Sequence, residues 1–177
     1  MSPMSFFSRS TAVLFFLLLS ACATQPPIAP KPAALTSATP EQMVAAIRAT
    51  AGTGEGELAV QPLRDPTVED LRQAASRLEA HKQYADAAKS LDQALAIVPD
   101  DPALLQERAE TALLLGDFAN AEKLAQRAYE LGSQVGPLCR RHWKTVEQVR
   151  LMAGDAAGAA SATRQVEGCK VAAPNRF

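Results

Sequence analysis

The sequence predicts an all-α protein built from antiparallel helix pairs, and three observations predict it. Apolar residues recur at helical spacing, glycine and aspartate mark short turns, and a set of residues repeats after 34 positions. The repeated residues are Tyr84, Ala87, Leu91 and Ala94, which correspond to Phe118, Ala121, Ala125 and Ala128. A repeat of this length is typical of stacked helix–turn–helix units, because one pair alone cannot bury its apolar face.

The first predicted helix pair has one apolar stripe on each side of a turn at Lys82–Gln83. The stripes are Leu71, Ala74, Ala75 and Leu78, followed by Ala87, Ala88, Leu91, Ala94 and Leu95. Alanines are expected where two closely packed helices cross, since a longer side chain has no room there. Thr67 and Asp70 predict a capping box at the start of the first helix.

Two further pairs follow along the chain. Asp101, a capping acid, stands before Pro102 and predicts the start of the second pair, whose turn is Gly116–Asp117. Gly154–Asp155 corresponds to that turn at an offset of 38, with four extra residues at Gly136–Cys139. We expect Cys139 to precede the next helix, which carries Trp143.

This pattern resembles the tetratricopeptide repeat, whose consensus combines bulky, small and aromatic residues at fixed positions. The matching residues are Leu71, Ala75, Tyr84, Ala87, Ala94 and Pro99 in the first unit, and Leu105, Ala109, Phe118, Ala121 and Ala128 in the second. The third unit keeps only Trp143 and Ala159. The resemblance covers about Val68 to Cys169 and implies about three tetratricopeptide-like units in a short right-handed α-solenoid. The alternative is a generic bundle of alanine-rich helices.

The resemblance also implies a candidate partner-binding groove, because this family binds proteins on the concave face made by the first helix of each unit. The corresponding residues are Arg72, Ser76, Glu79, Gln106, Glu110, Leu113, Arg141, Lys144, Gln148 and Leu151. Arg72 and Lys144 are suited to a partner's acidic groups, and the leucines to apolar contact. The open alternative is that the charges are solvated and the leucines pack under their neighbours.

The N-terminus predicts export and a lipid anchor. Ala12 to Leu19 is an apolar run too short to span a membrane stably, and the next residues, Ser20-Ala21-Cys22, complete a motif that resembles the lipobox of bacterial lipoproteins. The resemblance implies that residues 1–21 are a removed signal peptide and that Cys22 carries the lipid. Ala23, in place of an aspartate, implies the outer membrane, on its periplasmic side. An ordinary secretory signal is the alternative.

These features divide the chain into segments. Residues 22–40 are expected to be the lipidated cysteine and a proline-rich tether, and residues 41–66 a short helix with a flexible or extended segment. Residues 67–170 form the helical repeat domain, and residues 171–177 a tail. The amphipathic helix at 41–49 either docks on the repeats or remains detached, and the sequence does not decide between these.

The remaining cysteines, Cys139 and Cys169, are an even pair in the oxidising compartment that the lipobox implies, so a disulfide is predicted between them. Antiparallel packing of the last two helices brings their ends together. A metal site made by these cysteines and His142 is the weaker alternative, because it has no fourth ligand.

The sequence predicts an adaptor without catalytic activity, cofactor or metal. The chain has only two histidines, and no acid–base or nucleophile arrangement stands out at either of them. The net charge of −1 offers no attraction for nucleic acid. The expected partners are therefore the membrane, through Cys22, and an unidentified envelope protein or peptide segment. More specific alternatives are a pilotin-like or outer-membrane assembly lipoprotein, and an accessory protein to a peptidoglycan enzyme.

Overall fold

Helices alone make up the regular secondary structure of the computed structural model, which describes residues 32–52 and 65–170. The seven helices in these ranges are α1 (Pro40–Thr50), α2 (Pro66–Ala80), α3 (Tyr84–Ile97), α4 (Pro102–Leu114), α5 (Phe118–Leu131), α6 (Gly136–Ala153) and α7 (Ala156–Gly168). The predicted all-α fold is confirmed. No helix in the described ranges has the length and apolar character needed to cross a membrane.

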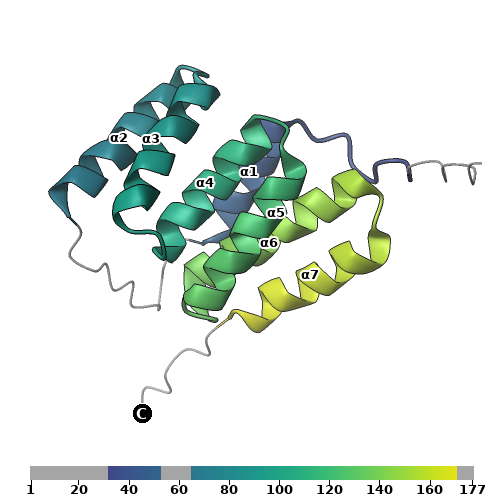
Figure 1. Ribbon diagram of the computed structural model, residues 1–177. Helices are drawn as coiled ribbons and strands as arrows, with labels where there is room; N and C mark the ends of the chain where they lie inside the picture. Colours follow the sequence, from purple (N-terminus) through teal and green to yellow (C-terminus); the bar gives the residue numbers. More distant parts are fainter. Residues whose placement is uncertain (1–31, 53–64, 171–177) are drawn as a thin grey trace, which may run out of the picture. The chain divides into compact units, whose positions relative to one another are not determined.

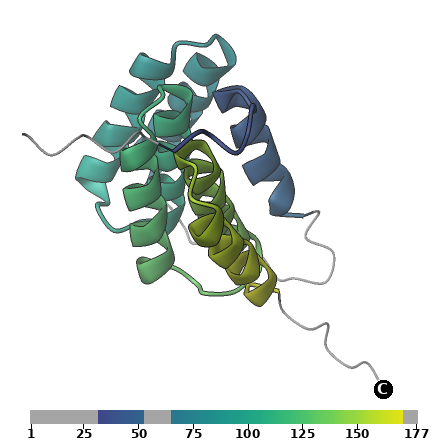
Figure 2. The same cartoon turned by 90° about the vertical axis from the view of Figure 1, so that its right-hand side faces the viewer.

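Helices α2 to α7 form three consecutive hairpins, α2 with α3, α4 with α5 and α6 with α7 (Figure 1). Each hairpin also packs on the next through α3 with α4 and α5 with α6. All of them belong to one unit, Lys31–Phe177. Helix α1 precedes the hairpins in sequence but lies against α4 and α6 (Figures 1 and 2).

Small residues occupy the helix crossings, as the repeat predicts. Ala75 of α2 is buried with Ala87 and Ala94 of α3 in one cluster. In the next layer, Ala109 and Ala125 are buried together, with Trp143 packed beside them. Because these side chains end at the β-carbon, the helix axes can approach closely without leaving voids.

Two helix starts share the same Asp–Pro arrangement. Asp101 Oδ1 accepts hydrogen bonds from the amides of Ala103 and Leu104 at 2.8 and 3.1 Å. The capping box predicted at Thr67 and Asp70 is wrong, because α2 begins at Pro66 and Asp65 is its N-cap. Asp65 Oδ1 accepts from the Thr67 amide at 2.7 Å. Proline in the first turn costs nothing there, since its missing N–H has no intrahelical partner to lose.

Helix α6 is longer at its start than predicted. The four extra residues of the third unit, Gly136–Cys139, form its first turn, so Cys139 lies within the helix instead of before it. Pro137 is tolerated because it stands in that first turn.

Several predicted features lie outside the described residues. They are the signal peptide at 1–21, the lipidated Cys22, the tether up to residue 31, the segment 53–64 and the tail at 171–177.

Candidate functional site

The concave face made by α4 and α6 is covered by α1. Met43 and Ile47 of α1 are 0% exposed. Val44 and Ile47 pack in one apolar cluster with Leu113 of α4 and Val149 of α6. Helix α1 therefore docks on the repeats, which settles the question that the sequence leaves open.

A fully buried carboxylate lies beneath α1. Glu110 of α4 is 0% exposed and accepts hydrogen bonds from Arg48 of α1 at 2.7 Å, from Arg141 of α6 at 3.0 Å, and from Gln106 at 2.8 Å. A buried charge is tolerated only when it is paired and hydrogen-bonded in this way. Glu110 thus links α1, α4 and α6.

Arg48 joins this carboxylate to a second one on α2. Its guanidinium also donates to Glu79 at 2.6 and 3.0 Å. Burial lowers the pKa of Arg48, but the hydrogen bonds and charges of Glu79 and Glu110 outweigh burial and raise it overall. The cation of α1 is therefore held between two acids of the hairpins.

The polar network continues from Gln106 to His142. Gln106 donates to Thr145 Oγ1 at 2.9 Å, and its oxygen lies 2.7 Å from His142 Nδ1. Because this amide oxygen can only accept, Nδ1 carries the proton of a neutral imidazole. Burial, together with the nearby charge of Arg141, lowers the pKa of His142 to about 3.

This histidine predicts a specific loss of stability in acid. The unfolded chain binds a proton at His142 near pH 6.5, whereas the folded chain does so only near pH 3. Between these values the unfolded state binds more protons, so the free energy of unfolding falls by about 1.4 kcal/mol per pH unit as the pH decreases. Urea unfolding at pH 6.5, 5.5 and 4.5 should show this slope. His142→Asn keeps a donor near the Nδ1 position but cannot titrate, so equal slopes for the two proteins would contradict the prediction.

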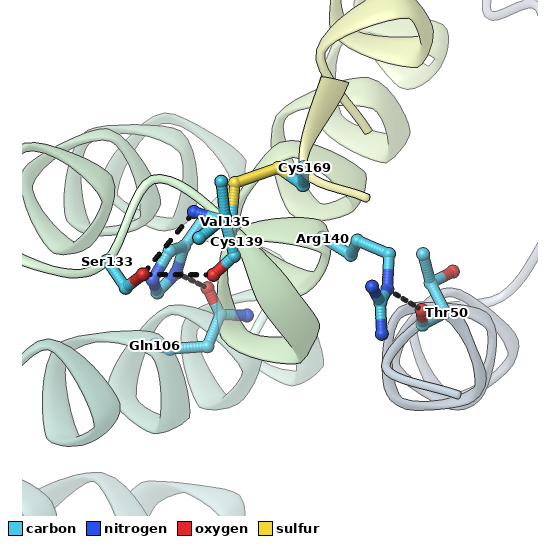
Figure 3. Close-up of a disulfide and its surroundings, with 8 residues drawn as sticks. Thr50, Gln106, Ser133, Val135, Cys139, Arg140 and Cys169 are labelled. Atoms are coloured by element: carbon cyan, nitrogen blue, oxygen red, sulfur yellow. Dashed lines mark hydrogen bonds between the residues drawn. A yellow bond between two sulfur atoms is a disulfide. The ribbon is translucent and has the colours of Figure 1, made fainter. Parts of the chain in front are cut away.

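The C-terminal end of α1 is held by an arginine of α6. The Arg140 guanidinium donates to the backbone oxygen of Thr50 at 3.0 Å (Figure 3). It also donates to the backbone oxygen of Ala51 at 2.5 Å. These carbonyls belong to the last turn of α1, where no intrahelical donor remains and a cation is favourable. Arg140 therefore caps α1.

Helix α1 leaves part of the concave face open. A cleft of about 420 Å³ lies between the C-terminal end of α1 and helix α2. Arg48 and Arg141 line it together with Arg72, Ser76 and Glu79 of α2. Arg72 is paired with Glu107 of α4 at 2.9 Å. Three arginines and three glutamates are among the residues that line the cleft, so it has no strong net charge.

Cys139 and Cys169 form a disulfide bond, with their Cα atoms 5.7 Å apart (Figure 3). The bond joins the first turn of α6 to the C-cap of α7. The Gly136 amide also donates to the Cys169 oxygen at 2.7 Å. Because the two sulfurs are bonded to each other, neither cysteine can bind a metal as a thiolate. In the described ranges no three His, Cys, Asp or Glu side chains are grouped as a metal site.

No protein-family model matches the chain, and no curated protein sequence matches it. Among solved structures, the globular C-terminal domain of LpoP from P. aeruginosa aligns with 31% sequence identity and a TM-score of 0.55. The alignment covers 59% of this chain and 99% of that domain. The helical domain belongs to the family of the LpoP C-terminal domain.

In this LpoP-type domain the residues predicted to line a groove fall into two groups. Along α4 and α6, Gln106, Glu110, Leu113 and Gln148 are buried. Along the open cleft, Arg72, Ser76, Glu79 and Arg141 are accessible to a partner. The structure thus separates a covered part of the concave face from an open part.

The last two predicted groove residues, Lys144 and Leu151, belong to neither group. Lys144 is paired with Glu147 at 2.6 Å. The Leu151 oxygen accepts a hydrogen bond from the Leu35 amide at 2.8 Å. The chain just before α1 therefore contacts the C-terminal end of α6 at Leu35, a residue that was predicted to belong to the tether at 22–40.

Sequence reasoning missed Arg48 and Arg140 of this LpoP-type domain. Arg48 follows the apolar residues of the amphipathic helix at 41–49, so it could have been noticed as a candidate partner for the acids of the groove. The contact of Arg140 with α1 gives no such signal, because the acceptors there are backbone oxygens 90 and 89 positions away.

Proposed function

We propose that this chain is a lipid-anchored outer-membrane protein whose tetratricopeptide-like domain is a noncatalytic accessory of a peptidoglycan synthase. The observation that carries the proposal is the alignment over 99% of the LpoP domain at 31% identity. Similarity to LpoP supports an envelope lipoprotein that regulates peptidoglycan synthesis. Among the alternatives that the sequence leaves open, this favours the accessory protein over the pilotin-like one.

The N-terminal sequence supports the same location. An apolar run followed by Leu19-Ser20-Ala21-Cys22 fits export and lipidation, and the absence of an aspartate after Cys22 fits the outer membrane. A lipid-anchored protein of this kind reaches a synthase by direct contact across the periplasm. The proposal therefore assigns the chain a binding role with no chemistry of its own.

The open cleft is the proposed contact for the synthase. Its mixture of paired arginines and glutamates is suited to a polar protein surface, because each charge can exchange its present partner for one on the other protein. The charges in and around it also disfavour nonspecific apolar association. Proteins that bind transiently typically use such polar, accessible surfaces.

In-cell photo-crosslinking tests this proposal. A photo-reactive residue is placed at Gln73, an exposed residue that lines the cleft, and in a control at Ala160, which is exposed on α7. We expect the Gln73 protein to capture a peptidoglycan synthase at least several-fold more strongly than the Ala160 protein. We expect Cys22→Ser to lower the yield, because the unanchored protein is diluted through the periplasm. The proposal would be contradicted if neither the Gln73 protein nor the Ala160 protein captured a peptidoglycan synthase.

A further inference from the structure

We infer that the concave groove of α2, α4 and α6 is a receptor for an amphipathic helix of the partner protein, and that α1 is its resident occupant. The inference rests on the proposed function and specifies the element of the partner that is bound. The fitting helix carries an apolar pair, a third apolar residue one turn later and an arginine directly after it. Helix α1 has this pattern in Met43, Val44, Ile47 and Arg48.

The apolar part of the groove is shaped for a helix. Leu113 of α4 and Val149 of α6 are buried in one apolar cluster with Val44 and Ile47 of α1. Residues three and four apart lie on the same face of a helix, so one short helix presents all of its apolar side chains to this strip at once. A partner helix with the same spacing buries the same surface.

The acidic part of the groove selects a basic residue. Glu79 and Glu110 come from different helices, and the Arg48 guanidinium bridges them with hydrogen bonds of 2.6 to 3.0 Å. The planar guanidinium can serve two carboxylates at once, which a lysine does less well. This pair of acids fixes where the arginine of an incoming helix must lie.

Two hydrogen bonds from Arg140 recognise the end of a helix through its backbone, whatever side chains the helix carries. Arg140 donates these hydrogen bonds to the backbone oxygens of Thr50 and Ala51. Any helix that ends at this position offers the same free carbonyls. The residues that follow such an end lie next to the open cleft, which α1 leaves unfilled. A partner whose chain continues into the cleft therefore makes contacts that α1 lacks.

Helix α1 can leave without dismantling the hairpins. It is joined to α2 through residues 51–65 and takes no part in the three helix pairs. After its departure, Glu110 still has Arg141 and Gln106 as hydrogen-bond partners. The buried carboxylate is then not left unpaired, so the cost that usually accompanies removal of a buried partner is reduced. With 11 residues, α1 is also too short to be a stable helix by itself.

The test uses the mature full chain and a fluorescent synthetic peptide of residues 39–52. Ile47→Asp unseats α1, because it places a charge in the apolar strip, whereas Ala45→Asp adds the same charge on the exposed side of α1. If α1 fills the wild-type groove more than nine-tenths of the time, the peptide should bind the Ile47→Asp protein at least about tenfold more tightly than wild type. The Ala45→Asp protein should behave as wild type. Equal peptide affinity for all three folded proteins overturns the inference.

Hydrogen exchange on the wild-type chain keeps the inference testable if Ile47→Asp does not fold. Amides of α1 should exchange at least about tenfold faster than those of α4 and α6, because α1 opens locally. If α1 amides exchange only at the rate of global unfolding, the inference is overturned.

Competition separates this inference from the proposed function. Peptide at saturating concentration should abolish capture of the synthase by the Ile47→Asp protein. Undiminished capture would show that the synthase binds elsewhere, which overturns the groove as receptor and leaves the proposed function standing. Capture of no synthase by any variant overturns the proposed function, and the assignment of the groove to a synthase helix fails with it.

Discussion

Replacing Glu110 with glutamine is expected to lower the free energy of unfolding by about 3 kcal/mol. The change removes a charge that is 0% exposed and that neutralises Arg48 and Arg141. Both arginines then remain in the groove without their shared carboxylate, and Gln106 loses a charged acceptor. Urea unfolding followed by circular dichroism at pH 7 measures the effect.

Glu79→Gln is the matched control for this prediction. Glu79 pairs with the same Arg48, but both side chains of that pair are partly exposed, at 20% and 45%. Water screens such a pair, so its loss is expected to cost less than about 1 kcal/mol. Similar losses for the two variants would show that burial of Glu110 does not govern the strength of the network.

Removing the disulfide with Cys139→Ser and Cys169→Ser together is expected to cost about 3.5 kcal/mol of stability. The bond closes a loop with a sequence separation of 30 residues, and most of its effect comes from restricting the unfolded chain. It joins the two ends of the hairpin whose repeat pattern is weakest. Thermal and urea unfolding of the double variant and of the wild type compare the two states.

Reduction of the wild type provides the control for the disulfide. A phosphine reductant should bring the unfolding midpoint of the wild type close to that of the double variant, and should leave the variant unchanged. Two results together would show that the bond contributes nothing to stability. The reductant would leave the unfolding midpoint of the wild type unchanged, and the double variant would unfold at the same midpoint as the wild type.

The hairpins could be predicted from the sequence because their determinants are local. Ala75, Ala87 and Ala94 are small at regular spacing, and their burial follows from the helical period alone. Asp101–Pro102 marks a helix start through groups that lie within three residues of one another. The cap of α2 was misplaced by two residues, since both Asp65 and Thr67 are good capping residues and only the backbone conformation decides between them.

The candidate site was predicted only in part. Matching to the repeat identified Glu110 and Leu113 as concave-face residues, but it did not show that α1 covers them. Arg48 and Arg140 act across 62 and 90 positions of sequence. Such contacts depend on where α1 docks on the hairpins, and the residue spacing within one repeat does not predict that position.

By itself, the sequence determined that this protein is all α-helical, where the hairpins and most of their turns lie, and which face of each pair is apolar. These properties depend on side-chain size and polarity at short range, which the order of residues specifies directly. Only the tertiary structure decided that α1 occupies the concave face, that Glu110 is shared by Arg48 and Arg141, and that an open cleft remains beside α2. Those outcomes depend on the free energy of docking one amphipathic helix against several others, which is a sum over contacts distant in sequence.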